Sequence, residues 1–379
     1  MERFDVVVAG TGGMGAAAAL HLARRGVSVL GLDRFPVAHD RGSSHGQTRL
    51  IRLAYYEHPD YVPLLRRAYQ LWHELERGSG APLLTESGVV MAGPCGCDLV
   101  AGAELAARTH GLDLERIALA DVRRRWPALS IPDEWRVVHE ACGGYLFVEA
   151  CVRAHAEAAV RAGAELRHGV EVRGWRAEGD SLVVETDRGA VAAGRLVLCP
   201  GAWASDLVRL PSLALRVQRK SLFWHEPLAA HRAAHAAGVL PCFAFDTPAG
   251  FFYGFPALDE RGVKVAEHTG GREVADPLRV DRGIEAAERA AVEHFLRAHL
   301  PGACGRLTDH ATCLYTMSPD SHFVLGLHPE EPRVAIAAGF SGHGFKFASV
   351  MGEVLADLAL DGRTRHPIGF LAPERPPPA

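Results

Sequence analysis

The chain has 379 residues, of which 48% are hydrophobic and 23% charged, and its formal net charge is −4 at pH 7. This length fits one large α/β unit or two interlocked domains, and the slightly acidic charge without a basic stripe argues against binding to nucleic acid or to a membrane surface. No apolar run approaches the ~18 residues of a membrane span, and the opening segment is too short and too acidic for a signal peptide, so we expect a soluble protein.

A βαβ unit is predicted for the start of the chain, with its strand, helix and second strand at residues 5–9, 16–25 and 27–32. The turn after the first strand is rich in glycine. Gly10 permits a tight turn, Gly12 lets the backbone approach a pyrophosphate, and Gly15 lets helix and strand pack closely. Asp33 then stands where an acid binds ribose hydroxyls. The pattern predicts a dinucleotide site, and it does not distinguish FAD from NAD.

The next segment, residues 42–49, is a polar loop and does not continue the βαβ repeat. Ionisable side chains are concentrated in and just after this loop: His45, Arg49, Arg52 and Glu57. One interpretation is a solvated charged surface. As a group beside a dinucleotide, these side chains indicate anion binding. Helical periodicity then returns over residues 63–75.

The rest of the chain is predicted to form two groups of helices and strands, one that completes the nucleotide domain and one that forms an antiparallel domain. A helix and small sheet that suit closure of the nucleotide domain are predicted at residues 150–162, 165–172, 181–186, 190–193 and 195–199. An antiparallel domain with Pro and Gly turns is predicted from strands at 217–224, 242–245, 250–255 and 263–268. A helix, a buried strand and a last helix follow at 282–299, 333–338 and 345–360. Residues 375–379 are rich in proline, and we expect a frayed tail there.

A second glycine-rich loop lies between the last buried strand and the last helix, at residues 339–346. Its glycines allow close backbone approach, and Lys346 stands at the start of the following helix. The loop is therefore predicted to contact a ligand. The alternative is an ordinary strand-to-helix turn.

The cysteines are scattered, which is unlike a disulfide framework and favours a reducing cytoplasm. They are Cys95, Cys97, Cys142, Cys151, Cys199, Cys242, Cys304 and Cys313. The close pair Cys95 and Cys97 lacks a matching Cys or His pair at zinc-site spacing. We predict a turn there and no metal site.

Four motifs, in collinear order over nearly the whole chain, carry a resemblance to a known family. They are Gly10 to Gly15, Gly46 to Arg49 with Arg52, Cys313 to Thr316 followed by Pro319-Asp320 and His322-Phe323, and Gly339 to Lys346. In these motifs the chain resembles the monomeric sarcosine oxidase and N-methyltryptophan oxidase family of amine-oxidising flavoproteins. The last two motifs are specific to that family. Ser321 departs from it, because the family commonly has an acidic or amide residue before the His-Phe pair.

The resemblance implies an α/β fold, α+β when the whole chain is considered. A Rossmann-type FAD-binding domain would be assembled from the discontinuous segments 1–80, 145–210 and 311–379. An antiparallel-sheet substrate domain would comprise residues 81–144 and 211–310.

The resemblance also implies that FAD is the cofactor and that the sulfur of Cys313 is covalently bonded to it. The implied cofactor-binding residues are Gly10, Gly12, Gly13, Met14, Gly15, Asp33, Arg34, Ser43, Ser44, Thr48, Val170, Gly201, Trp203, Cys313, Gly342, Gly344, Phe345 and Lys346. No nicotinamide or metal is required.

Catalytic and substrate residues follow from the same resemblance. Lys264 would promote the reaction with O2, because a fixed ammonium stabilises the negative charge that develops on oxygen. The other implied residues are His45 and Arg49 beside the flavin, Tyr253 and His268 around the amine, and Arg52, Lys346, Glu57 and Tyr315 in the substrate site. Arg52 and Lys346 would bind a substrate carboxylate, with Glu57 orienting Arg52.

The implied reaction is oxidation of the C–N bond of a secondary amino acid, N-methyl or cyclic, by hydride transfer to flavin. O2 becomes hydrogen peroxide and the imine is hydrolysed, as in sarcosine oxidase. The partners are a small amino acid and O2, and the protein is expected to be a monomer. Larger N-methyl or cyclic imino acids, such as N-methyltryptophan, pipecolate or a biosynthetic intermediate, are alternative substrates. A nicotinamide-dependent dehydrogenase and a non-catalytic flavin-binding subunit are alternatives of another class.

Lysine is scarce, because only Lys220, Lys264 and Lys346 are lysines among 41 basic residues. A lysine offers a compact ammonium whose pKa the environment can shift, which arginine does not. Two of the three have roles implied above. Lys220 has none, and we expect it on a strand edge, replaceable by arginine with little loss.

Overall fold

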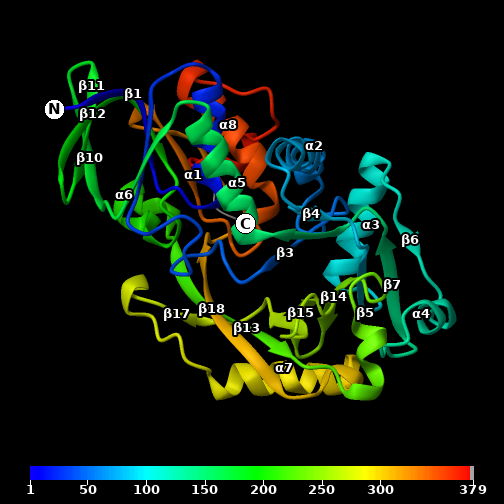
Figure 1. The fold of residues 1–379 in the computed structure, drawn as a ribbon. Coiled ribbons are helices and arrows are strands. Elements are labelled where there is room, and N and C mark those ends of the chain that lie inside the picture. The colour runs from blue at the N-terminus through cyan, green and yellow to red at the C-terminus, as the bar shows by residue number, and fades with distance from the viewer. Residues whose placement is uncertain (376–379) are drawn as a thin grey trace.

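Two large β-sheets, each with its own helices, form the upper and lower parts of the molecule in Figure 1. The structure is a computed structural model, and it describes residues 1–375. The blue N-terminal and red C-terminal segments both lie in the upper part, although they are far apart in the sequence. The upper part is thus assembled from discontinuous pieces of the chain.

The upper sheet has eight strands and a parallel centre. Its strands are β10 (Val172–Glu178), β11 (Ser181–Thr186), β12 (Gly189–Leu198), β1 (Arg3–Ala9), β2 (Val29–Asp33), β9 (Glu165–His168), β20 (Glu331–Ala338) and β19 (Val324–His328). The pairs β1–β12, β1–β2, β2–β9 and β12–β20 are parallel. The carboxyl ends of five strands therefore meet at one edge of the sheet, which is where ligands bind in such folds.

Four helices form a layer beside this sheet: α1 (Gly13–Arg24), α2 (Val62–Ser79), α5 (Val148–Arg161) and α8 (Ala348–Asp361). The central helix α1 contacts both α5 and α8. Its run of buried alanines, residues 16–19, keeps the helix narrow. A Cβ on Gly352 of α8 would meet the backbone of Ala17, so these two helices pack at close range. Small residues thus set the spacing of this layer.

The lower sheet has nine strands, and every pair except β14–β5 is antiparallel. Its strands are β17 (Arg272–Glu273), β13 (Arg216–His225), β16 (Val263–Glu267), β15 (Gly250–Phe255), β14 (Cys242–Thr247), β5 (Val89–Pro94), β7 (Trp135–Glu140), β6 (Glu115–Arg116) and β18 (Leu307–Met317). Side chains alternate between its faces. Phe252 stacks on Phe295 of α7 (Ala286–His299), with ring centroids 4.6 Å apart. The next residue, Tyr253, belongs to the cluster on the opposite face, together with Cys313.

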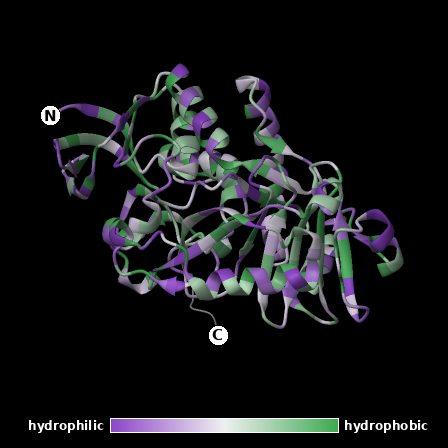
Figure 2. Ribbon diagram, turned by 60° about the horizontal axis from the view of Figure 1, so that its bottom comes forward, coloured by the Kyte–Doolittle hydropathy of each residue, from purple (hydrophilic) through white to green (hydrophobic). Residues whose placement is uncertain are grey.

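A small third sheet contains β3 (Thr48–Ile51), β8 (Gly144–Phe147) and β4 (Leu84–Thr85). Three further helices complete the fold: α3 (Asp98–His110), α4 (Leu119–Arg125) and α6 (Ala204–Val208). In Figure 2, α4 at the right-hand edge is mostly hydrophilic, whereas the strands beside it carry hydrophobic residues. Within residues 1–375, no helix is both long and apolar enough to cross a membrane.

The predicted fold class is confirmed, and the structure corrects several details. The strand expected at 165–172 divides into β9 and β10, with Gly169 at a φ of 70° between them. The helix expected from residue 282 begins at Ala286. The β14–β5 pair makes the lower sheet mixed. The domain boundary expected at residue 311 falls inside β18, which pairs with β13 over its length.

The C-terminal tail is ordered as far as Arg375, contrary to the prediction of fraying from that residue. The guanidinium of Arg375 donates to both oxygens of Asp320, at 2.6 and 2.7 Å. It also donates to the carbonyls of Phe323 and His322. The expectation for residues 376–379 lies outside the described residues.

Candidate active site

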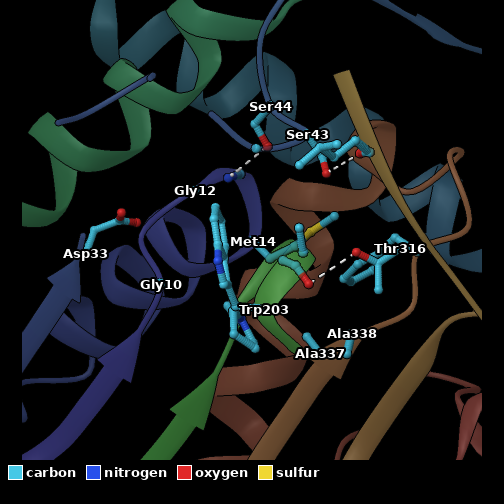
Figure 3. A pocket seen from close by; sticks show the side chains of 18 of the residues that line it. Gly10, Gly12, Met14, Asp33, Ser43, Ser44, Trp203, Thr316, Ala337 and Ala338 are labelled. Carbon is cyan, nitrogen blue, oxygen red and sulfur yellow. Dashed lines mark hydrogen bonds between the residues drawn. The ribbon is translucent and has the colours of Figure 1, made fainter. Parts of the chain in front are cut away.

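A cavity lies at the carboxyl edge of the upper sheet, where the turns after β1, β2, β9, β12 and β20 meet. Its lining includes Gly10, Gly12, Gly13, Met14, Asp33, Arg34, Ser43, Ser44, Val170, Gly201, Trp203, Gly342, Gly344 and Phe345. Figure 3 shows Asp33 and Gly12 on one side of this space and Thr316, Ala337 and Ala338 on the other. Fourteen of the predicted cofactor residues therefore share one cavity wall.

The three glycines of the first turn have different surroundings. Gly10 has a φ of 89°, and a Cβ there would collide with the carbonyl of Cys199. A Cβ on Gly15 would collide with the carbonyl of Gly10. A Cβ on Gly12, in contrast, would meet only Ser44 Oγ at 3.9 Å. The first and third glycines allow close packing, and the second leaves the backbone open towards the cavity.

Unpaired donors in the cavity wall fit a dinucleotide. Arg34 Nη1 and Trp203 Nε1 are buried and have no hydrogen-bond partner within residues 1–375. Buried donors are normally satisfied, and phosphate oxygens and ring nitrogens are acceptors. Asp33 joins the two sides of the turn, because its Oδ2 accepts from Thr11 N at 2.7 Å and its Oδ1 from Phe35 N at 2.9 Å.

A second cavity adjoins the first and shares Arg49, Gly342 and Phe345 with it. Its other lining residues are Leu50, Arg52, Tyr56, Glu57, Phe251, Tyr253, His268, His343 and Lys346. The structure thus gathers the predicted substrate residues in one place, with Tyr315 at the wall of the first cavity. Tyr56, Phe251 and His343 were not singled out from the sequence.

Arg52 and Lys346 are two buried cations in this smaller cavity. Arg52 Nη2 donates to Glu57 Oε2 at 3.0 Å, and its Nε has no partner within residues 1–375. Lys346 Nζ donates to the carbonyl of His343 at 2.7 Å and to Tyr55 Oη at 3.4 Å. Since an ammonium has three N–H donors, one has no acceptor within the part of the chain that the structure describes. Each cation therefore keeps at least one donor available for a ligand.

Aromatic side chains and a neutral histidine form another wall. His268 Nδ1 lies 3.4 Å from Tyr315 Oη, and the His268 ring packs edge-on against Phe251. Burial lowers the pKa of His268 to about 3, so its imidazole is uncharged near neutral pH. Tyr253 is 7% exposed and lies 6.4 Å from His268 between ring centroids. This wall is aromatic and carries no charge near neutral pH.

Cys313 lies behind the wall of the first cavity, in contact with Arg49. Arg49 Nη2 is 3.1 Å from Cys313 Sγ and donates to the carbonyl of Ser43 at 2.9 Å. Burial raises the pKa of Cys313, but the positive charge of Arg49 and the neighbouring His45 outweigh this effect and bring the value to about 7. Thiolate is the reactive form of cysteine, and this thiol is poised to ionise.

Lys264 also lies one layer behind the cavities, beside the start of β3. Its Nζ donates to the carbonyls of Gly46 at 2.6 Å and Thr48 at 2.8 Å, and to Thr48 Oγ1 at 3.2 Å. Burial, followed by repulsion from Arg49, holds the pKa of Lys264 well below its ordinary value. Its three oxygen acceptors nevertheless match the three N–H donors of the ammonium form.

Some predicted residues occupy other positions. Gly15, Thr48 and Cys313 line neither cavity, and Lys346 lines only the smaller one. His45 lines a separate pocket with Gln47 and Trp224, and its Nε2 has no partner within the described residues.

The expectation that Lys220 lies on a strand edge is wrong. Lys220 is 4% exposed, and its strand β13 is flanked by β18 on one side and by β16 and β17 on the other. Its Nζ donates to the carbonyls of Thr269 and Gly270. Burial lowers the pKa of Lys220 to about 8. The strand is interior because β18, distant in sequence, covers the side that looked like an edge.

A cavity of this kind, at the carboxyl edge of a parallel sheet with a glycine-rich first turn, belongs to a dinucleotide-binding protein. The family model for FAD dependent oxidoreductases matches residues 5–358. The chain belongs to this family and is an FAD-dependent oxidoreductase.

Individual relatives agree with the family. The chain is 40% identical to the monomeric sarcosine oxidase of Streptomyces avermitilis over 98% of this chain and 97% of that protein. It is 35% identical to N-methyl-L-tryptophan oxidase of Escherichia coli over 96% of both chains. Among solved structures it is similar to NikD, an unusual amino acid oxidase essential for nikkomycin biosynthesis, with a TM-score of 0.84, 26% identity and 98% coverage of both chains.

Proposed function

We propose that this chain oxidises the C–N bond of a secondary amino acid, with sarcosine as the first candidate. The observation that carries the proposal is the pair of free donors on Arg52 and Lys346 in a cavity that adjoins the cofactor cavity. Two donors suit the two oxygens of one carboxylate. The names of the relatives, sarcosine oxidase and N-methyl-L-tryptophan oxidase, favour the same substrate class.

The residues around the larger cavity fit FAD. The glycine turn and the start of α1 would hold its pyrophosphate, and Asp33 its ribose. Arg34 and Trp203 would find acceptors for their free donors. When bound, FAD supplies the two-electron acceptor that oxidation of an amine requires.

The side chains of the smaller cavity would orient the substrate. Arg52 and Lys346 fix its carboxylate, so that its nitrogen and N-substituent point towards the uncharged wall of Phe251, Tyr253 and His268. This wall excludes water and, with His268 neutral, adds no positive charge next to the amine. Oxidation of the C–N bond leaves an imine, which water hydrolyses to an aldehyde and an amino acid with a primary amine.

Two further residues have proposed roles behind the cavity wall. Lys264 would supply a fixed positive charge for the reduction of O2 to hydrogen peroxide. Cys313, with its pKa lowered to about 7, would form a covalent bond to the flavin. The shared acceptor Thr48 O, which is 2.9 Å from Arg49 Nη1 and 2.8 Å from Lys264 Nζ, joins Lys264 to Arg49. Arg49 in turn contacts Cys313 Sγ directly, at 3.1 Å.

We also propose a monomer in a reducing cytoplasm. The name monomeric sarcosine oxidase of the relatives supports the first point. All eight cysteines are free thiols, which supports the second.

The proposal is tested by coupling hydrogen peroxide formation to a dye while the purified protein is offered sarcosine, N-methyltryptophan, pipecolate and proline. Peroxide from at least one secondary amino acid is expected, and none from the matching amines that lack a carboxylate. A protein that yields no peroxide from any amine would instead be a flavin-binding subunit.

Binding of carboxylates should depend on pH through Lys346. Burial, and next the positive charge of Arg52, lower the pKa of Lys346 to about 7. The protonated form binds an anion, so affinity should be greatest below that pKa and fall as the pH rises through it. Each pH unit above it should weaken binding by up to about tenfold. Titration of the holoenzyme with acetate at a series of pH values, followed by the visible flavin spectrum, measures this fall in affinity, which is the alkaline limb of the pH profile. An affinity that does not change with pH would contradict the role of Lys346.

A further inference from the structure

A chain of hydrogen bonds joins the turn at residues 318–322 to Lys346, although neither the turn nor its connecting side chains have a role in the reaction proposed above. The carbonyl of Ser321 lies 2.9 Å from His343 Nε2. His343 Nδ1 lies 2.6 Å from Tyr55 Oη, and Tyr55 Oη lies 3.4 Å from Lys346 Nζ. Tyr55 and Lys346 are at most 5% exposed, so the chain is shielded from water near Lys346.

The donor and the acceptor of each hydrogen bond in this series can be assigned. A carbonyl oxygen only accepts, so His343 Nε2 carries a proton. Burial, and next the charge of Lys346, hold the pKa of His343 well below its ordinary value, so the ring is neutral. His343 Nδ1 is therefore bare and accepts the single hydroxyl proton of Tyr55. The lone pairs of that hydroxyl remain for Lys346.

We propose that Tyr55 and His343 are positioning residues that hold Lys346 with one free N–H directed at the substrate carboxylate. The hydroxyl of Tyr55 accepts one proton of the ammonium and the carbonyl of His343 accepts a second, at 2.7 Å. A cation–π contact, with Lys346 Nζ 5.0 Å from the centroid of the Tyr55 ring, further fixes the position of the ammonium. Arg52 lies over the same tyrosine ring at 4.9 Å, so one aromatic ring sets the spacing of the two cations.

The far end of the chain is anchored by the turn itself. Ser321 has a φ of 61°, in the left-handed region, which turns its carbonyl towards His343. Asp320 Oδ1 accepts from His322 N at 3.0 Å, and the carboxylate of Asp320 is paired with Arg375. The turn is thus fixed from two sides. This explains how a turn that lines neither cavity is tied to the substrate site.

The test rests on the proposed function, because it uses a carboxylate ligand, and it replaces Tyr55 by phenylalanine. The change Tyr55→Phe keeps the ring and removes the acceptor for Lys346. Acetate should bind to the holoenzyme about tenfold more weakly, as expected for loss of one hydrogen bond to a charged group. Because that acceptor stabilises the ammonium, its loss lowers the pKa of Lys346. The alkaline limb of acetate binding should therefore move to lower pH, which a loss of stability alone would not produce.

The matched control is Tyr61→Phe. Tyr61 is a neighbouring buried tyrosine whose hydroxyl contacts His322 Nδ1 at 3.1 Å and accepts from Phe323 N, but it does not contact Lys346. This variant should keep the parent's acetate affinity and pH limb. An equal shift of the limb in both variants would show that the turn, and not the Tyr55 hydroxyl, sets the site.

A second pair of variants tests the same proposal in case the Tyr55→Phe protein does not fold. His343→Asn keeps an acceptor near the Nδ1 position, whereas His343→Leu removes it, so the leucine variant should shift the limb further. A parent holoenzyme that does not bind acetate contradicts the proposed function. A parent that binds acetate, with Tyr55→Phe and His343→Leu indistinguishable from it in affinity and limb, overturns the positioning role alone.

Discussion

Replacement of Lys264 by methionine should slow the reaction of the reduced protein with O2 by about 10²–10³-fold, the effect of removing one preorganised electrostatic group. Lys264 is 1% exposed and its ammonium is held by Gly46 and Thr48. Negative charge develops on oxygen in this reaction, and burial makes a fixed positive charge more effective than in water. Methionine is of similar length, and it removes the charge together with the hydrogen bonds to Gly46 and Thr48.

The measurement mixes anaerobically reduced protein with oxygenated buffer and follows recovery of the oxidised flavin spectrum. Lys220→Met is a matched control, because Lys220 is also a buried lysine but donates to Thr269 and Gly270. Its rate with O2 should remain close to that of the parent. Anaerobic reduction by substrate should survive in Lys264→Met. Reoxidation of Lys264→Met at the parental rate would show that Lys264 has no part in the reaction with O2.

Features encoded locally could be predicted from the sequence. The glycine turn, the acid at the end of β2 and the alternation of β15 follow from backbone rules that involve neighbouring residues. The structure places Gly10, Gly12 and Asp33 at the carboxyl edge of the sheet, as the βαβ pattern requires. That Arg52 and Lys346 lie in one cavity could be expected only from the family resemblance, because no local sequence pattern relates residues so far apart in the chain.

Features that depend on distant contacts were missed. Tyr55 meets His343 across 288 residues of sequence, and no periodicity signals that contact. Lys220 looked like a strand-edge residue because its own segment says nothing about β18, which pairs beside it. Arg375 looked like part of a frayed tail, since its partner Asp320 is 55 residues away. In each case a contact with a residue distant in the sequence determines where the side chain lies, and the residue's own segment does not indicate that contact.

Replacement of Cys313 by alanine should abolish covalent attachment of the flavin. In the parent, the flavin should stay with the protein after acid precipitation or in denaturant, whereas in Cys313→Ala it should be released into the supernatant. The physical reason is that Cys313 is the thiol that Arg49 holds ready to ionise, at a distance of 3.1 Å. Attachment should also slow below pH 7, because the thiolate fraction falls as the pH drops through the Cys313 pKa of about 7.

Cys199 provides the matched control for this experiment. Cys199 is itself a lining residue of the cofactor cavity, but burial raises the pKa of its thiol to about 12, so the thiol stays protonated and unreactive. Cys199→Ala should therefore retain its flavin through denaturation. If proximity to the cavity were enough, Cys199 would compete with Cys313, and the alanine variant of Cys313 would still retain flavin. A parent whose flavin is released by acid would contradict covalent attachment altogether. The comparison of these two thiols separates the effect of position from the effect of ionisation, and we expect the bond to form at the thiol that Arg49 helps to ionise.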